Sequence, residues 1–490
     1  MVKIKLSASD REFFGLVSRA SFTNPFSDQR LEIDRAISRS EPGKTWPEVR
    51  PEAIGEIGKR IEKLDGGKTL CIDDFQAGDR QIIEHLFLFD VYHQFNEQFD
   101  KLIDQQAATG EKLLKVTFAN EAISKLKTRG FSMDRARHYF SLFYQIRRAF
   151  YYIERGLVGR CESMKKLRTN LWNNIFTHDI LHYESMLWDK MEDFSTLLLG
   201  PTGCGKGAAA AAIGRSGFIP FDESKQVFAE SFTDMFVPIN LSQYAESLLE
   251  SELFGHKKGS FTGAVASHDG LFALCGQHGS IFLDEIGEVS TQIQIKLLQV
   301  LQERVFSPVG SHQKLSFHGR VIAATNRSID QLRIDGKFRD DFYYRLCSDC
   351  IYVPGLQQRV QEDGGELDDM IAVTIKRIVG YESDELVETV KEVISKRLGK
   401  DYHWPGNVRE LAQCVRRVII KRDYEGDTVC RMSGSNDFIK AIEAGTLDGQ
   451  SILAGYCSSL YKKHKTYEEV ARITKLDRRT VKKYIQSGDK

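Results

Sequence analysis

The sequence has little proline, no surplus of charge and no long apolar run, and each shortage excludes a class of protein. Its 490 residues include 10 prolines, 41% hydrophobic and 28% charged residues, as in an ordinary globular chain. Because 68 basic residues balance 68 acidic ones, wholesale coating of nucleic acid is not expected. The absence of a signal-peptide pattern and of any run of about 18 apolar residues predicts a cytoplasmic protein with no membrane span.

The nine cysteines are scattered and odd in number, unlike the dense spacing of a small disulfide-bonded scaffold. The pair Cys347 and Cys350 has CxxC spacing, but a zinc site would need a second pair, and none follows. We therefore expect reduced thiols without a metal role.

The hydrophobic pattern changes several times along the chain, which predicts a multidomain α/β protein of about three domains at roughly 150 residues each. Helical patterns fill an N-terminal domain, with helices expected at residues 80–99, 120–128 and 133–154. Short apolar runs then alternate with helical segments, which predicts a parallel sheet covered on both faces. These strands are expected at 195–199, 237–240, 280–284 and 320–325. The predicted domains are 1–156, 157–353, a helical lid at 354–422, a linker at 423–450 and a basic C-terminal domain at 451–490.

Aromatic residues are concentrated near the end of the N-terminal domain. They are suited either to lining a ligand pocket or to a helical core or interface, and the second interpretation is favoured. No acidic cluster of the kind found in phosphoacceptor receivers accompanies them. The residues are Tyr139, Phe140, Phe143, Tyr144, Phe150, Tyr151 and Tyr152.

A glycine-rich segment follows the first predicted strand and opens an alanine-rich helix. Glycines allow backbone amides to face phosphates, the helix N-terminus adds its positive dipole end, and Lys206 is placed to reach the outer phosphates. The order of strand, loop, lysine and helix predicts ATP binding. Gly207 offers no hydroxyl to Mg²⁺, although a water can take that position. The segment is Gly200, Pro201, Thr202, Gly203, Cys204, Gly205, Lys206 and Gly207.

A later apolar strand ends in two carboxylates, Asp284 and Glu285. Phosphoryl transfer needs one group that holds Mg²⁺ and one that orients the attacking water. We expect Asp284 to be the magnesium ligand and Glu285 to polarise the water.

The segment from Glu250 to His256 continues into Gly259, Ser260, Phe261, Thr262, Gly263 and Ala264. These blocks resemble the central AAA+ domain of bacterial enhancer-binding proteins, which activate sigma-54 RNA polymerase. The resemblance covers roughly residues 157–422 and implies that the second block is a loop that contacts sigma-54. Ser260 stands where the family usually has alanine.

Other family motifs follow in order. The resemblance makes Asn240 the switch asparagine, Asn326 the first sensor, and Arg409 the second sensor. Arg339 and Arg345 match arginine fingers that act on the nucleotide of a neighbouring subunit, where a guanidinium stabilises the charge of the transition state. Fingers acting in trans imply a homo-oligomer, from a dimer to a hexameric ring.

The last 30 residues are basic, with ten Lys or Arg against four Asp or Glu. Helices are expected at 466–473 and 478–486, with Asp477 as the N-cap of the second. The pair resembles a Fis-type helix-turn-helix, which implies binding of double-stranded DNA at an upstream site. The expected DNA-binding residues are Arg478, Arg479, Thr480, Lys482 and Lys483.

Together these features indicate a helical N-terminal regulatory domain, an AAA+ P-loop parallel-sheet α/β domain with a helical lid, and a C-terminal helix-turn-helix. We expect an activator that binds upstream DNA and uses ATP hydrolysis in a ring to remodel the sigma-54 RNA polymerase closed complex. Two alternatives stay open. Gly207 and Ser260 are compatible with a DNA-bound regulator that hydrolyses poorly, and the motor could remodel another protein.

Overall fold

The computed structural model describes residues 3–41, 43–261, 264–399, 402–426, 445, 448–464 and 466–487. The chain forms two compact units, residues 1–383 with 406–412 and residues 384–405 with 413–490. Among the described residues, no helix combines the length and apolar character needed to cross a membrane.

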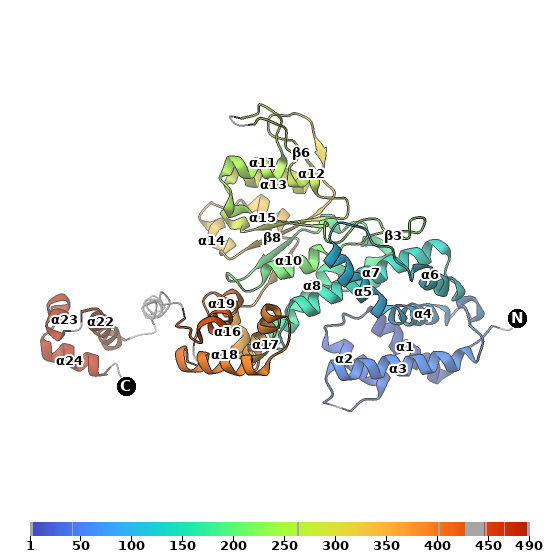
Figure 1. Ribbon diagram of the computed structural model, residues 1–490, viewed down its shortest axis with the longest axis horizontal. Helices are drawn as coiled ribbons and strands as arrows, with labels where there is room; N and C mark the ends of the chain where they lie inside the picture. The colour runs from blue at the N-terminus through green and yellow to red at the C-terminus, as the bar shows by residue number, and fades with distance from the viewer. Residues whose placement is uncertain are drawn as a thin grey trace. The chain divides into compact units, whose positions relative to one another are not determined.

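The N-terminal region is helical, as predicted (Figure 1). Serine side chains begin several of these helices, because a serine oxygen accepts a hydrogen bond from an otherwise unpaired amide of the first turn. Ser7 caps the first helix in this way at 3.1 Å, and Ser132 caps the last at 3.4 Å. The helices are α1 (Ala8–Phe22), α2 (Asp28–Ser38), α3 (Trp46–Asp65), α4 (Arg80–Gln94), α5 (Asn96–Thr109), α6 (Ala119–Thr128) and α7 (Met133–Gly156).

The single helix expected at 80–99 is two helices, and that expectation was wrong. Phe95 separates α4 from α5 at φ −109° and ψ 8°, and its N–H bonds to the oxygen of Tyr92 rather than continuing the α-helical ladder. The Phe95 side chain is only 2% exposed. No proline or glycine marks the break in the sequence.

Five parallel strands form the central sheet, in the order β4–β5–β8–β1–β9. The four expected ranges match observed strands to within one residue at each end, and the strand at 349–352 was not predicted. Two short antiparallel pairs, β2–β3 and β6–β7, lie outside this sheet. The bounds are β1 (Thr196–Leu199), β2 (Phe221–Asp222), β3 (Val227–Phe228), β4 (Phe236–Asn240), β5 (Ser280–Asp284), β6 (Val305–Phe306), β7 (Leu315–Ser316), β8 (Arg320–Thr325) and β9 (Asp349–Tyr352).

The sheet separates two hydrophobic cores, because successive side chains of a strand point to opposite faces. Leu198 and Phe282 belong to the core that also contains the N-terminal helices and α10 (Lys206–Gly214). Leu197 and Ile281 belong to the other core, with α11 (Glu246–Phe254), α13 (Thr291–Glu303) and α15 (Asp340–Leu346). Both faces are therefore covered, as the alternation of strands and helices predicts.

The N-terminal helices and the P-loop helix share one continuous core. Arg148 of α7 is fully buried and donates to the carbonyl oxygens of Arg215 and Gly217, each at 2.6 Å, where α10 ends. Gln145 donates to the oxygen of Ser216 at 2.9 Å. Burial lowers the pKa of Arg148 to about 10, so the guanidinium stays charged at neutral pH. The side chains of α7 thus supply donors to the carbonyl groups of residues 215–217, which directly follow α10.

The remaining helices begin with α8 (Glu162–Phe176), which follows the N-terminal helices in the sequence and leads to β1 through the short α9 (Ile180–His182). The others are α12 (Leu271–Leu274), α14 (Ile329–Ile334), α16 (Leu356–Glu362), α17 (Glu366–Val379), α18 (Asp384–Arg397), α19 (Asn407–Lys421), α22 (Gly449–His464), α23 (Tyr467–Thr474) and α24 (Arg478–Ser487). The domain bounds proposed from the sequence remain predictions.

Replacing Arg148 by alanine is expected to lower the free energy of unfolding by about 3 kcal/mol or more, because two carbonyl groups lose their donor and a cavity forms. Arg155→Ala is the matched control on the same helix, since the Arg155 side chain is 55% exposed. Its effect should stay within about 0.5 kcal/mol. Urea unfolding followed by circular dichroism measures both, and equal midpoints would contradict the role given to Arg148.

Candidate functional site

The P-loop, residues 200–207, connects the end of β1 to α10. Gly200 has φ +155°, and a Cβ on it would lie 2.4 Å from the oxygen of Val353. Lys206 is 6% exposed, and its Nζ donates to the oxygens of Gly200 at 2.9 Å and Pro201 at 3.2 Å. The lysine, the loop and the N-terminus of α10 therefore converge in the arrangement that binds phosphate in other proteins.

A segment at residues 406–412 packs directly on the P-loop. A Cβ on Gly203, whose φ is +76°, would lie 2.4 Å from the oxygen of Gly406 and 3.0 Å from Cβ of Arg409. Asn407 Nδ2 donates to the oxygen of Thr202 at 3.0 Å, while its Oδ1 accepts from the N–H of Leu356 at 2.7 Å. The predicted second sensor, Arg409, thus lies beside the predicted phosphate loop.

Asn407 was not predicted as a site residue. The sequence places it beside Arg409, and its φ of +52° is one that asparagine tolerates better than most residues. That preference is the only signal that could have singled it out.

Three predicted site residues lie at the carboxyl ends of parallel strands. In the register of the sheet, Asn240 pairs with Asp284, and Asp284 pairs with Ala324 of β8. Asn326 follows β8, and its Nδ2 donates to Oγ1 of Thr202 at 2.6 Å. The carboxyl ends of parallel strands meet at one edge, which is where ligands bind in α/β sheets.

Glu285 adopts a strained backbone next to Asp284. Its φ of +59° and ψ of 44° lie in the left-handed region, and its Oε2 is buried without a hydrogen-bond partner among the described residues. Backbone strain of this kind gathers at functional sites. Asn240 Oδ1 instead accepts from the N–H and Oγ of Ser242, at 3.0 and 2.7 Å. The contact between Asn240 and Glu285 that a switch role implies is not formed in the described part of the chain.

The two predicted finger arginines do not reach the P-loop. Arg339 forms a bidentate ion pair with Asp341, at 3.0 and 2.7 Å, and Arg345 Nε donates to the oxygen of Leu301 at 2.8 Å. No contact of either arginine with residues 200–207 occurs in the part of the chain that the structure describes. A role at the nucleotide of this same chain therefore has no geometric support.

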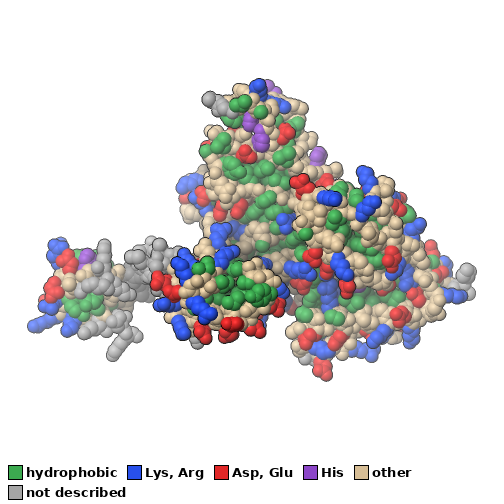
Figure 2. Space-filling view, in the orientation of Figure 1, with side chains coloured by type: hydrophobic (Ala, Val, Ile, Leu, Met, Phe, Trp, Pro, Cys, Tyr) green, Lys and Arg blue, Asp and Glu red, His purple; other side chains and the backbone are tan. Residues whose placement is uncertain are grey.

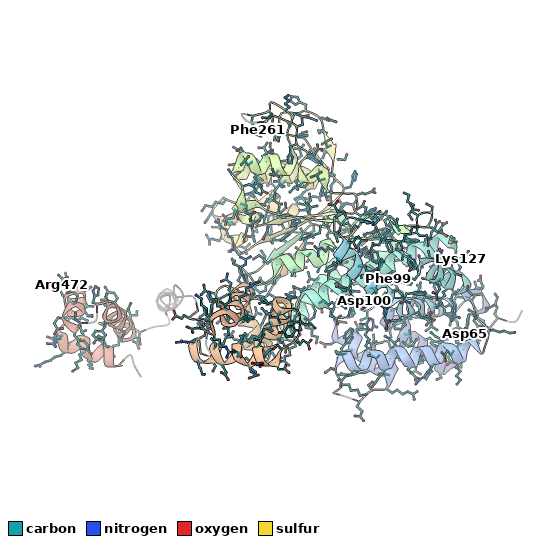
Figure 3. All side chains as sticks on the ribbon, viewed as in Figure 1. Asp65, Phe99, Asp100, Lys127, Phe261 and Arg472 are labelled. Carbon is teal, nitrogen blue, oxygen red and sulfur yellow. The ribbon has the colours of Figure 1, made fainter. Side chains whose placement is uncertain are left out.

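Of the segment at residues 259–264, the structure describes 259–261 and 264, and Figure 3 labels Phe261 near the top of the view. The N–H of Gly259 bonds to the oxygen of Ala264 at 2.9 Å, which closes the base of the loop. Phe261 is 39% exposed and packs edge-on against His256, with ring centroids 4.9 Å apart. Ser260 Oγ is buried, and Thr262 and Gly263 lie outside the described residues.

The C-terminal helices α22, α23 and α24 enclose a small core of Cys457, Val470, Val481 and Ile485. Lys475 turns the chain between α23 and α24 at φ 55°, and Asp477 Oδ1 accepts from the N–H of Arg479 at 2.8 Å. The N-cap and both helices match the prediction, whereas α22 was missed. Arg478, Arg479, Lys482 and Lys483 are exposed and Thr480 is half-buried. Figure 2 shows Lys and Arg side chains over this part of the chain.

Comparison with known proteins identifies the central region. Residues 182–351 match the family described as the sigma-54 interaction domain. Nitrogen fixation protein AnfA of Azotobacter vinelandii is 40% identical over 231 residues, which is 47% of this chain and 39% of that protein. The Nif-specific regulatory protein of Klebsiella pneumoniae is 40% identical over 265 residues, 54% of this chain and 44% of that protein.

The transcriptional regulatory protein GlrR of Escherichia coli K12 is 35% identical over 227 residues, covering 46% of this chain and 47% of that protein. The chain thus spans less than half the length of these relatives. A solved structure of NtrX from Brucella abortus with ATP aligns with 75% of this chain and 80% of its own, at 18% identity and a TM-score of 0.42.

Two glycines of the P-loop should respond in opposite directions to alanine. Gly203→Ala forces a left-handed residue against a backbone oxygen and is expected to lower the free energy of unfolding by about 1–2 kcal/mol. A Cβ on Gly207 would meet no atom within 4 Å, and this residue lies in α10, so Gly207→Ala should raise the free energy of unfolding by about 0.5 kcal/mol. Urea titration measures the free energy of unfolding of both variants. A larger decrease for Gly207→Ala than for Gly203→Ala would refute this account of the loop.

Proposed function

We propose that the protein is an ATP-hydrolysing activator of sigma-54-dependent transcription, because its central region matches the sigma-54 interaction domain. It binds upstream DNA and uses ATP hydrolysis in a ring to remodel the sigma-54 RNA polymerase closed complex. The observation that carries the proposal is the match of residues 182–351, which contain both the P-loop and the exposed Phe261 loop.

ATP is the proposed nucleotide, held at the carboxyl edge of the sheet. Lys206 and the amides of the loop bind its phosphates, and Asn326 and Arg409 lie against the same loop. Asp284 is the carboxylate that would hold Mg²⁺, an ion that favours oxygen ligands and keeps several waters. The ion would supply charge neutralisation of the phosphates. The free Oε2 of Glu285 is available to accept a hydrogen bond from the attacking water.

Hydrolysis is proposed to need a neighbouring subunit. The transition state spreads negative charge over phosphoryl oxygens, and a guanidinium supplied in trans stabilises it. Arg339 and Arg345 are the candidates, since neither contacts the P-loop of its own chain within the described residues. In a ring of several copies, Arg339 and Arg345 of each subunit would reach the nucleotide site of the neighbouring subunit. ATP turnover would then depend on protein concentration, because the ring must assemble first.

The Phe261 loop is the proposed contact with sigma-54. An aromatic ring that is 39% exposed on a glycine-flanked loop costs little to bury against a partner. In this scheme the loop moves with the nucleotide state. The helices α22 to α24 provide DNA binding through exposed basic side chains.

Lys206→Ala should abolish nucleotide binding by the full-length protein, because the loop loses the charge that faces the phosphates.

Phe261→Ala should leave ATP turnover within about twofold of the parent and weaken binding of purified sigma-54 by about tenfold or more. Binding is measured in the presence of ADP with a metal fluoride. Leu274→Ala is the control, since Leu274 is 62% exposed on α12 and outside the loop.

Three outcomes separate the alternatives. Sigma-54 binding that survives Phe261→Ala would refute the role of the loop. Nucleotide binding without turnover at any protein concentration would favour the poorly hydrolysing DNA-bound regulator. Turnover without any sigma-54 binding would favour a remodeller of another protein.

Arg479→Ala should weaken binding to duplex DNA and reduce the slope of log affinity against log salt by about 1, because one phosphate contact is lost. Arg472→Ala is the control, since Arg472 is ion-paired with Glu469 at 2.6 Å on the preceding helix. Fluorescence anisotropy at several salt concentrations measures both variants. If Arg472→Ala changed the salt-dependence slope as much as Arg479→Ala, the assignment of α24 as the DNA-contacting helix would be contradicted.

A further inference from the structure

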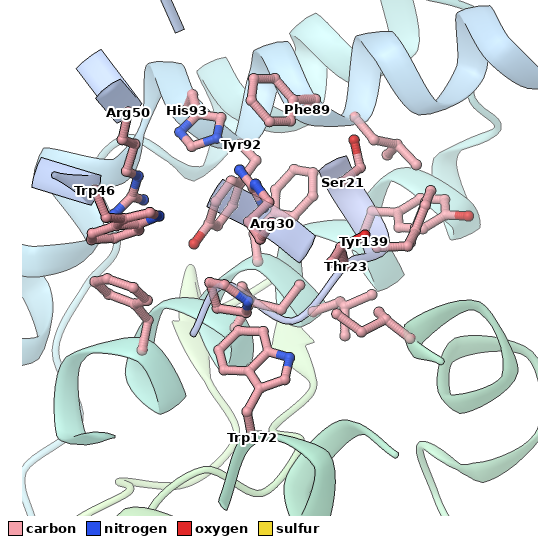
Figure 4. Close-up of a pocket in the computed structure, with 18 residues that line it drawn as sticks. Ser21, Thr23, Arg30, Trp46, Arg50, Phe89, Tyr92, His93, Tyr139 and Trp172 are labelled. Carbon is pink, nitrogen blue, oxygen red and sulfur yellow. The ribbon is translucent and has the colours of Figure 1, made fainter. Parts of the chain in front are cut away.

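The N-terminal region contains a pocket that is lined mainly by apolar and aromatic side chains, as small-molecule sites are. Helices α1, α2, α3, α4, α7 and α8 all contribute to its wall. Figure 4 shows Trp46, Arg50 and Tyr92 along one side, with Trp172 on the other. None of these residues belongs to the nucleotide site, the Phe261 loop or the DNA-binding helices.

The wall of the pocket is largely aromatic. Phe89, Phe143, Phe150 and Trp172 all line it and are at most 6% exposed. Of the aromatic cluster noted in the sequence, Tyr139, Phe143 and Phe150 face the pocket, whereas Phe140 and Tyr144 stack on Phe228 in the core. Part of the cluster therefore lines a pocket and part lies in the helical core, and ligand binding by the first part stays a prediction. A flat ring would find stacking surfaces here.

One positive charge in the pocket wall, that of Arg50, forms no direct ion pair among the described residues; the carboxylate of Glu154 acts on it only from beyond ion-pair distance. Arg30 is ion-paired with Asp34 at 2.9 Å, and Arg147, just outside, is paired with Asp100. Arg50 has no carboxylate within 4 Å in the described chain, and its guanidinium instead lies 4.8 Å from the ring centroids of both Trp46 and Phe150. Burial lowers the pKa of Arg50, and nearby Glu154 only partly opposes this shift.

Two hydrogen-bond donors in the wall have no acceptor. Nε1 of Trp46 and Nε1 of Trp172 are buried and unpaired among the described residues. A buried indole N–H without a partner is uncommon, because a donor taken out of water and left unpaired is unfavourable. His93 adds no charge, since burial and the nearby Arg50 hold its pKa well below the usual value. The pocket is therefore rich in donors and positive charge.

We propose that this pocket binds a small aromatic carboxylate, with its ring between the aromatic side chains and its carboxylate at Arg50. Such a ligand supplies an anion for the guanidinium and a flat ring for the aromatic wall. A neutral aromatic compound would leave Arg50 unpaired. An aliphatic acid would lose the stacking.

The pocket shares two helices with the nucleotide-binding region. On α7, Phe143 and Phe150 line the pocket while Arg148 holds the end of α10. On α8, Trp172 lines the pocket, and Asn174 donates to Oγ1 of Thr196 at 3.0 Å, at the start of the strand that enters the P-loop. Binding is thus expected to alter ATP turnover, and this part of the inference rests on the proposed function.

Calorimetry and tryptophan fluorescence of the full-length protein test the binding, without nucleotide. The probes are benzoate, its neutral counterpart benzamide and the non-aromatic cyclohexanecarboxylate. Benzoate should bind saturably at one site, and both counterparts about tenfold more weakly or worse, because each lacks one of the two interactions.

Arg50→Gln should weaken benzoate binding by about tenfold or more, since the charge-assisted contact is lost. Arg60→Gln is the matched control. Arg60 lies on the same helix α3 and also stacks on an aromatic ring, 4.0 Å from the centroid of Phe13, but it does not line the pocket. Trp172→Ala removes a ring of the wall and leaves Arg50 in place, so it should weaken benzoate and benzamide alike.

The proposal is overturned if benzoate does not bind, if benzamide binds as tightly, or if Arg50→Gln leaves the affinity unchanged. Should Arg50→Gln fail to fold, Arg50→Lys, which keeps the charge, must still discriminate benzoate from benzamide. A protein that binds benzoate but shows no ATP turnover contradicts the proposed function and supports the pocket. Turnover that ignores saturating benzoate removes only the coupling between them.

Discussion

The buried guanidinium of Arg148 connects the N-terminal helices to the end of the P-loop helix α10. Arg148 has no carboxylate partner within the described residues, and it stays buried because the carbonyl oxygens of Arg215 and Gly217 accept its hydrogens. A helix end supplies partial negative charge as well as free acceptors, so the arrangement satisfies both groups. The position of α10, and with it the P-loop, therefore depends on a helix from the N-terminal region. The sheet in turn depends on that region for one of its two covered faces.

The nucleotide site is assembled from segments far apart in the sequence. The side chain of Thr202 accepts a hydrogen bond from Asn326, and its carbonyl oxygen accepts one from Asn407. One loop residue is therefore bonded both to the predicted first sensor and to the segment that carries the predicted second sensor. Gly203 permits this approach because any side chain there would meet the oxygen of Gly406. The glycines of the motif thus serve the packing of the protein on itself as well as the approach of phosphate.

The sequence predicted the strands better than the contacts. Residues 280–284 and 320–325 are apolar runs ended by polar residues, and β5 and β8 have those bounds. The strand at 349–352 escaped because Asp349 and Cys350 dilute its apolar pattern. The break at Phe95 escaped because a buried phenylalanine looks the same inside a helix and at its end. Arg148 and Asn407 were missed for a related reason, since their roles come from tertiary partners that no local pattern records.

The core shared between α7, α8 and α10 has a consequence for how such a protein can be built from parts. A sensor joined to a motor by a flexible linker can be exchanged for another without regard to fit. Here the N-terminal helices and α10 share one core, so another N-terminal region could replace this one only if it reproduced the apolar surface of α7 and a donor in place of Arg148.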